Sequence, residues 1–226
     1  MTGNKKDKVL VVAAHPDDEL LGVAGTLCKH RDVGDSIFIL ILANGEDSRD
    51  SGADAEKRFG EAKAVAKDLG ATLYLENLPD NQFDSVPLLK IAKAVETIVA
   101  KVKPDIIYTH YAHDLNVDHR LANQAVLTAC RPIPGSSVKK ILSFETLSAT
   151  EWQVKDHRQF APDYYSDISK YLEEKKRIIK HYDKEMRAYP HPRSYEGVEI
   201  LAKYRGLEVG LKAAEAFKVV RIIKSS

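Results

Sequence analysis

The stretch KVLVVAAHPDDE at residues 8–19 decides the fold, because in it a long apolar run ends abruptly at a polar turn. Residues 8–14 form a continuous, Val-rich run, which is typical of a strand buried on both faces of a parallel sheet. Helical periodicity follows from about residue 19 to residue 31. We therefore predict a central strand that leads at once into a helix, with a His-Pro-Asp-Asp turn at the strand's carboxyl end.

Outward from this unit, apolar and amphipathic patterns alternate over more than half of the chain. The expected strands and helices lie in turn at residues 36–43, 54–69, 72–77, 86–102 and 105–110, with a further helix after residue 119. This alternation predicts an α/β fold: a single-domain, three-layer Rossmann-like sandwich with a mostly parallel sheet in the strand order 3-2-1-4-5. In such folds sites form beyond the carboxyl ends of the strands, so the functional residues should be sought there.

The last third of the chain has a less regular pattern. The expected elements are a strand over residues 140–147, a loop over 151–166, helices over 168–186 and 197–216, and a final strand over 217–223. The loop is rich in Tyr, Pro and Asp and could form a wall for a substrate. Neither repeats nor a linker interrupt the 226 residues, of which 44% are hydrophobic, so we predict one domain over residues 1–226.

The charge balance limits the possible partners. The 34 basic and 33 acidic side chains nearly cancel, so no overall field would attract nucleic acid or a membrane surface, and the charge alone names no partner. The chain has no run of about 18 apolar residues and its polar start lacks a signal-peptide core, which predicts a cytoplasmic protein without an integral membrane segment. Cys28 and Cys130 have neither metal-type nor redox-type spacing and are expected to be core residues.

Two polar clusters follow strands that the predicted order makes neighbours. His15 and Asp18, three positions apart on the first turn, can converge on one point, and imidazole with carboxylate is a common zinc pair. The second cluster follows the strand at 105–110 and holds three of the eight histidines within ten residues, namely His110, His113 and His119. Both clusters should face the same crevice at the topological switch point, which predicts one metal site.

The chemistry of that site has more than one interpretation. A carboxylate such as Asp17, next to the ligands, can collect the proton of a metal-bound water during attack on an amide. Two His and one carboxylate also serve non-haem iron oxygenases. A structural alternative is that Asp17 or Asp18 only caps the following helix. Asp17 favours hydrolysis. A binding module without catalysis is the alternative from a different class, although no G-x-G-x-x-G follows the first strand.

The motifs AHPDDE at 14–19 and DLNVDHR at 114–120, together with the order of strands and helices, resemble the PIG-L or LmbE-like family of zinc-dependent N-deacetylases. The resemblance covers about the first two thirds of the chain. It implies that His15, Asp18 and His119 bind Zn²⁺ while Asp17 is the base, and that the reaction removes the N-acetyl group from an N-acetylglucosamine-type conjugate. It also makes a homo-oligomer plausible. Another amide as substrate, and iron as the native metal, remain alternatives.

The chain departs from the family at one position. Many members have a His three residues before the last ligand, and here Asn116 stands in its place. An Asn can donate a hydrogen bond to an oxyanion but cannot supply a proton to the departing amine. The proton could come from Asp17 or another His, and the candidates are His110, His113 and His191, the last within the run YPHPRS.

The remaining candidates concern the substrate. Arg58 and Arg120 could grip a phosphate or carboxylate, because guanidinium forks suit such groups. Asn44 follows the second strand and could contact a sugar hydroxyl, and His113 is a further candidate at the rim. Asp118 could orient an imidazole through its ring N–H or cap the helix near His119, and the cap is the preferred interpretation.

Overall fold

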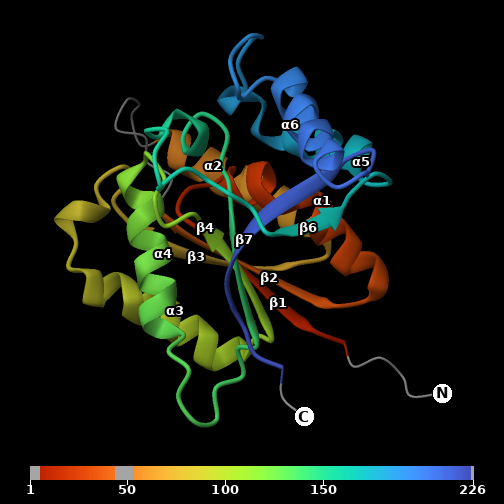
Figure 1. Cartoon of the computed structure of the whole chain (residues 1–226). Coiled ribbons are helices and arrows are strands. Elements are labelled where there is room, and N and C mark those ends of the chain that lie inside the picture. The colour runs from red at the N-terminus through yellow and green to blue at the C-terminus, as the bar shows by residue number, and fades with distance from the viewer. Residues whose placement is uncertain (1–5, 44–52, 225–226) are drawn as a thin grey trace.

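The computed structural model describes residues 6–43 and 53–224, and these form one seven-stranded sheet in the order β3-β2-β1-β4-β5-β7-β6 (Figure 1). The strands are β1 (Lys8–Ala13), β2 (Ser36–Ala43), β3 (Thr72–Leu78), β4 (Ile106–His110), β5 (Lys140–Phe144), β6 (Tyr164–Asp167) and β7 (Ala214–Ile222). The first five run parallel in the predicted order 3-2-1-4-5, which is thereby confirmed. The pairs β5–β7 and β7–β6 are antiparallel and extend the sheet on one side.

Helices cover both faces of this sheet, as Figure 1 shows. They are α1 (Asp18–Val33), α2 (Ala53–Leu69), α3 (Leu88–Val102), α4 (Val117–Ala129), α5 (Leu172–Ile179) and α6 (Tyr195–Leu207). Val9 and Val11 of β1 belong to the core shared with α1, α2, α5 and α6. Leu10 and Val12 belong to the opposite core, shared with α3 and α4. This alternation explains the uninterrupted apolar run of β1 and confirms the predicted three-layer α/β fold.

The last third of the chain differs from the predicted pattern in four places. The strand predicted over residues 140–147 is β5, which ends at Phe144. β6 overlaps the end of the predicted loop and was not predicted, because a four-residue strand at a sheet edge has too short a pattern to detect. The predicted helix over 168–186 is α5 followed by a 3₁₀ segment, Lys180–Glu185, with a kink at Tyr182. The predicted helix over 197–216 ends at Leu207, and β7 begins at Ala214. Between them Gly210 adopts a φ of +73°, which favours glycine and turns the chain back.

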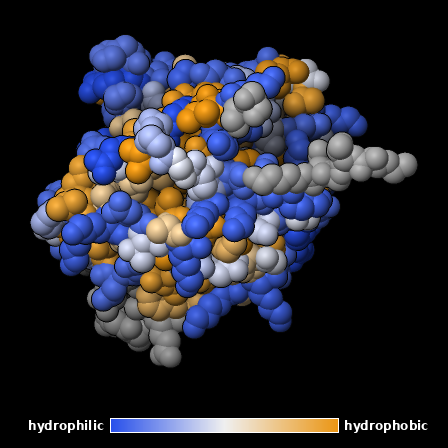
Figure 2. Space-filling view, turned by 90° about the horizontal axis from the view of Figure 1, so that it is seen from below, coloured by the Kyte–Doolittle hydropathy of each residue, from blue (hydrophilic) through white to orange (hydrophobic). Residues whose placement is uncertain are grey.

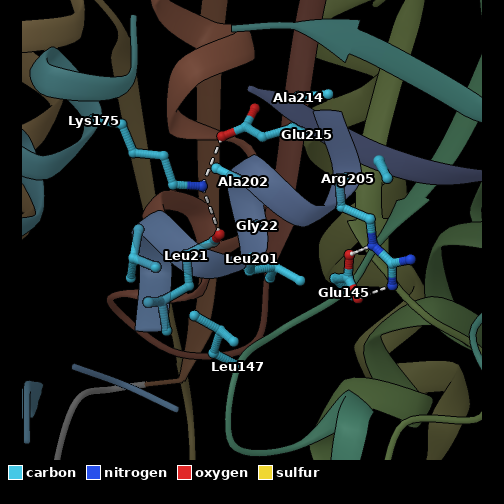
Figure 3. A pocket seen from close by; sticks show the side chains of 12 residues that line it. Leu21, Gly22, Glu145, Leu147, Lys175, Leu201, Ala202, Arg205, Ala214 and Glu215 are labelled. Carbon is cyan, nitrogen blue, oxygen red and sulfur yellow. Dashed lines mark hydrogen bonds and ion pairs between the residues drawn. The ribbon is translucent and has the colours of Figure 1, made fainter. Parts of the chain in front are cut away.

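A buried ion pair holds α1 against α5 and β7 (Figure 3). Lys175 of α5 is 4% exposed, and its Nζ donates to the Leu21 carbonyl at 2.9 Å and to Glu215 Oε1 at 2.7 Å. The Glu215 carboxylate also accepts from the backbone N–H groups of Gly25 and Thr26. The charges are thus satisfied from several elements, which fixes α1 and therefore the turn that precedes it.

No helix in the described part of the chain is long and apolar enough to span a membrane. Viewed from below, the surface mixes hydrophilic and hydrophobic side chains (Figure 2). Cys28 and Cys130 are both buried and free, as expected for core residues.

Candidate metal centre and active site

The turn after β1 brings His15 back over the start of α1. Asp17 has a φ of +113°, a conformation that residues other than glycine rarely adopt. The His15 backbone N–H donates to Asp18 Oδ2 at 2.9 Å, and His15 Nδ1 lies 3.2 Å from the same oxygen. Asp17 occupies the N-cap position of α1, but its side chain makes no capping hydrogen bond. The strained turn therefore leaves the Asp17 carboxylate available for another role.

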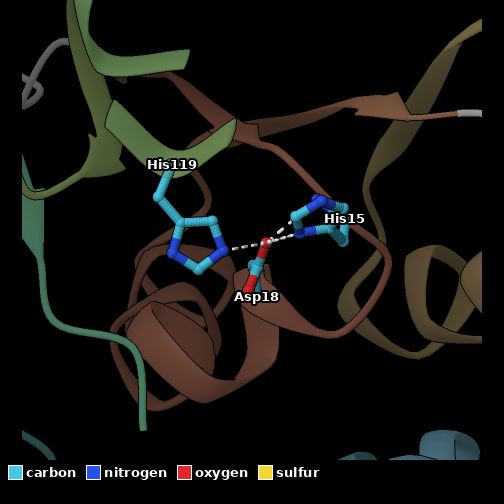
Figure 4. A group of neighbouring side chains, drawn as sticks. All are labelled: His15, Asp18 and His119. Atoms are coloured by element: carbon cyan, nitrogen blue, oxygen red, sulfur yellow. Dashed lines mark hydrogen bonds and ion pairs between the residues drawn. The ribbon is translucent and has the colours of Figure 1, made fainter. Parts of the chain in front are cut away.

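His119 reaches the same point from the first turn of α4. Its Nε2 lies 3.3 Å from Asp18 Oδ2, and Figure 4 shows the rings of His15 and His119 on either side of the Asp18 carboxylate. One donor atom from each residue lies within 4.8 Å of the others. His119 Nε2 and Asp18 Oδ1 are buried and lack a hydrogen-bond partner among the described residues. Buried polar atoms without partners are costly, so two imidazoles and a carboxylate in this arrangement fit a divalent metal ion.

Further carboxylates surround the two imidazoles on the side away from Asp18. His15 Nε2 lies 3.0 Å from Asp118 Oδ2 and 3.1 Å from Asp80 Oδ1. His119 Nδ1 lies 3.1 Å from Asp114 Oδ1. Burial opposes protonation, but these acids and Asp18 outweigh it and raise the pKa of His15 to about 10 and of His119 to about 9. The carboxylates thus orient the rings and favour a cation between them.

The preferred interpretation of Asp118 as a helix cap was wrong. The N-cap of α4 is Asn116, whose side chain accepts from the Asp118 backbone N–H at 2.8 Å. The Asp118 carboxylate instead bridges His15 Nε2 and the Phe83 backbone N–H, which donates to Oδ1 at 2.9 Å. Asp118 therefore orients the imidazole of His15.

Asp17 faces an arginine that the sequence analysis did not select. Arg193 Nη1 lies 2.7 Å from Asp17 Oδ2, and Arg193 Nε donates to the Leu147 carbonyl. Burial raises the pKa of Asp17 to about 7, while Arg193 lowers it and Asp18 raises it further. Arg193 belongs to the same YPHPRS run as His191, so the signal in the sequence is a cationic side chain two positions after that histidine.

A family model described as PIG-L, GlcNAc-PI de-N-acetylase, matches residues 10–130, a segment that contains all three candidate ligands. The chain belongs to the PIG-L family. The deacetylase YaiS of Escherichia coli K12 is 31% identical over 154 residues, which are 65% of this chain and 78% of YaiS. The diacetylchitobiose deacetylase of Thermococcus kodakarensis is 26% identical over 231 residues, which are 96% of this chain and 84% of that protein.

Similar folds in solved structures extend beyond deacetylases. The 4-carboxy-2-hydroxymuconate hydratase of Pseudomonas putida KT2440 matches with a TM-score of 0.76 at 19% identity, over 97% of this chain and 98% of that chain. The fold alone therefore does not decide the reaction of a PIG-L chain, and the reaction must be argued from the side chains of the site.

The PIG-L site opens into a pocket of about 320 Å³. Several of the predicted site residues line it: His15, Asp17, Arg58, Asn116 and His191. Further lining residues, which the sequence analysis did not select, include Asp80, Asn81, Trp152, Glu185, Arg187 and Arg193. Arg58 pairs with Glu185 at 2.7 Å, so the pocket wall is braced by an ion pair between α2 and the 3₁₀ segment after α5.

Other predicted site residues of this PIG-L family member lie away from the pocket. His110 is fully buried, stacks on His119 at 3.9 Å between centroids, and accepts the Ala14 backbone N–H on Nε2. Burial lowers its pKa to about 3. His113 is exposed, and the Arg120 guanidinium donates to the carbonyls of Asp114 and Leu115. Asn44 lies outside the described residues.

Proposed function

We propose that this chain is a zinc-dependent hydrolase that removes the acetyl group from the amide nitrogen of an N-acetylglucosamine-type sugar. The observation that carries this proposal is the position of Asp17. It adjoins the two-His, one-Asp set, it makes no capping bond, and it lines the pocket. The names of relatives, such as the diacetylchitobiose deacetylase, support the same reaction class.

The metal site fits Zn²⁺, whose preferred protein ligands include imidazole nitrogen and carboxylate oxygen. Bound there, the ion would polarise the acyl carbonyl and lower the pKa of a water ligand. The chain's own part is to hold His15, Asp18 and His119 in place through the outer carboxylates Asp114 and Asp118.

Asp17 takes the proton of the attacking water. Burial raises its pKa to about 7, so about half of the carboxylate is ionised at neutral pH, and the ionised form is basic enough to accept a proton. Arg193 Nη1 donates to Asp17 Oδ2 at 2.7 Å. This hydrogen bond orients the carboxylate and leaves Oδ1 free of that bond. Asn116 Oδ1 is held by the Asp118 backbone N–H, whereas its Nδ2 makes only a long contact, at 3.5 Å from Asn81 Oδ1, and can donate to the oxyanion.

Of the three histidine candidates, His110, His113 and His191, the last lines the pocket. Its Nδ1 accepts the Arg193 backbone N–H at 3.1 Å, so in the neutral ring the proton resides on Nε2. We assign His191 a hydrogen bond from its Nε2–H to the substrate, and the proton that the departing amine needs returns from Asp17, which took it from the water. We assign His110 a positioning role. Its side chain is fully buried and its Nε2 accepts the Ala14 backbone N–H, so it cannot exchange a proton with the pocket.

The test pairs zinc content with acetate release from a panel of N-acetylglucosamine conjugates. Asp17→Asn should retain about one zinc per chain and lose about 10²- to 10⁴-fold in kcat, because a positioned base contributes that range. His15→Ala should empty the site. Equal loss of zinc in both variants would contradict the division of roles. Metal-loaded protein that hydrates an unsaturated acid but releases no acetate would contradict the proposed reaction.

A further inference from the structure

The mouth of the pocket carries one large aromatic ring. Trp152 is the single tryptophan of the chain, lines the same pocket as His15 and Asp17, and is 52% exposed. Most of the other lining side chains are charged or carry amide, hydroxyl or imidazole groups. The half-exposed indole is a large apolar surface beside such groups, and aromatic walls of this kind orient ligands in pockets.

The position of this ring is fixed by the segment that carries it. Trp152 ends the short 3₁₀ turn Thr150–Trp152, and the Glu151 carboxylate accepts the backbone N–H groups of Ser148 and Ala149. Thr150 accepts the Thr146 backbone N–H on its hydroxyl oxygen. The segment is therefore held by its own polar contacts before any ligand arrives.

The same segment is connected to the metal centre. The Thr150 hydroxyl donates to Asp114 Oδ2 at 2.5 Å, and Asp114 Oδ1 lies 3.1 Å from His119 Nδ1. On the other side, Trp152 meets His191 edge to face, with 5.6 Å between centroids and 86° between the rings. The segment that carries the indole is thus fixed relative to the candidate metal ligands, which is what a specificity-determining surface requires.

We propose that Trp152 selects pyranose-ring substrates by stacking its indole against the C–H face of the N-acetylated sugar. This inference rests on the proposed function, because it places the acetamido group of that sugar at His15 and Asp17. A pyranose has an apolar C–H face and a rim of hydroxyl groups. The indole covers that face, while Asn81 and Arg187 supply hydrogen bonds at the rim. An acyclic amide has no such face.

The first test uses the zinc-loaded Asp17→Asn protein, in which turnover is slow. Because the chain has one tryptophan, its emission reports on this ring alone. We expect N,N′-diacetylchitobiose to change the emission saturably, whereas N-acetylethanolamine, which carries the amide without a ring, leaves it unchanged. Calorimetric binding of the sugar without a change in emission would overturn the proposal, as would equal changes with both compounds.

The second test compares KM with kcat in the zinc-loaded enzyme. Trp152→Ala should raise KM for diacetylchitobiose about tenfold with a smaller change in kcat, because stacking is made in the ground state as well as the transition state. Trp152→Phe should restore most of the affinity. Tyr204→Ala, which removes a 53% exposed ring on α6 away from the pocket, is the matched control and should leave KM unchanged. A wild-type KM in Trp152→Ala overturns the proposal.

The two tests separate this inference from the proposed function. If the zinc-loaded wild type releases acetate from no N-acetylated sugar, the proposed function fails. The emission titration still decides whether Trp152 binds a pyranose. If acetate is released and the Trp152→Ala protein binds and turns over sugars as the wild type does, the proposed function stands and the assignment of Trp152 fails.

Discussion

Asp17 lies in surroundings that act on its carboxylate in opposite directions. Burial and the neighbouring Asp18 favour the protonated form, and the Arg193 guanidinium favours the ionised form. The result is a pKa of about 7, several units above that of a carboxyl group in water. A base with such a pKa accepts a proton readily near neutral pH and can return it in a later step.

This balance predicts the direction of a pH effect. The base must be ionised, so kcat/KM should fall as the pH falls through the pKa of Asp17, near or below pH 7. Arg193→Met removes the charge that lowers this pKa, so the acidic limb of the profile should move to higher pH. Arg177→Met is the control, because Arg177 lies on α5 outside the pocket lining and pairs with Asp68 at 2.8 Å. An acidic limb that stays in place in Arg193→Met would show that Asp17 is not the titrating group.

Among the elements, α1 depends on a polar contact inside the core. Its buried residues pack on β1 and β2, and the Lys175–Glu215 pair ties its middle to α5 and β7. Removing one partner of a buried pair leaves the other charge in a low-dielectric interior. Since α1 begins at Asp18, a shift of this helix would also displace a candidate ligand.

We expect Lys175→Met to lower the free energy of unfolding by about 3 kcal/mol, because Glu215 then remains buried without its cation. The double variant Lys175→Met with Glu215→Gln should recover part of that loss, since the unpaired charge is gone. Urea denaturation followed by circular dichroism measures both. Lys203→Ala breaks an exposed pair with Glu199 and should change the free energy of unfolding by less than about 1 kcal/mol. Similar losses in Lys175→Met and Lys203→Ala would contradict the assigned role.

At the scale of the whole molecule, the two thiols report on the integrity of both cores. Cys28 lies in the core on one face of the sheet and Cys130 in the core on the other. Burial raises the pKa of each thiol to about 12, so the reactive thiolate is scarce at pH 8. Ellman's reagent should therefore modify neither cysteine in the native protein and both after denaturation. Fast labelling of one native thiol would indicate local opening of that core.

The sequence predicted those parts of the fold that depend on local patterns. The five parallel strands were found because each is an apolar run or a regular alternation between helices, and the order 3-2-1-4-5 then placed His15 opposite His119. β6 and the kink at Tyr182 were missed, because both depend on packing against distant segments. The contact between Asp17 and Arg193 was missed for the same reason, since 176 positions separate the two residues.

The cytoplasmic location and the homo-oligomer stay predictions.

Asp17 and Arg193 come from two distant segments of the chain, and the same is true of the pocket as a whole. All three candidate ligands and Asp17 lie within the family match at residues 10–130, whereas Trp152, His191 and Arg193 lie beyond it. In the proposed function the earlier part supplies the metal ligands and the base, and the later part forms much of the pocket wall that would meet the rest of the substrate. We therefore expect exchanges of the later segments between relatives to change which molecule is accepted while the reaction type is kept.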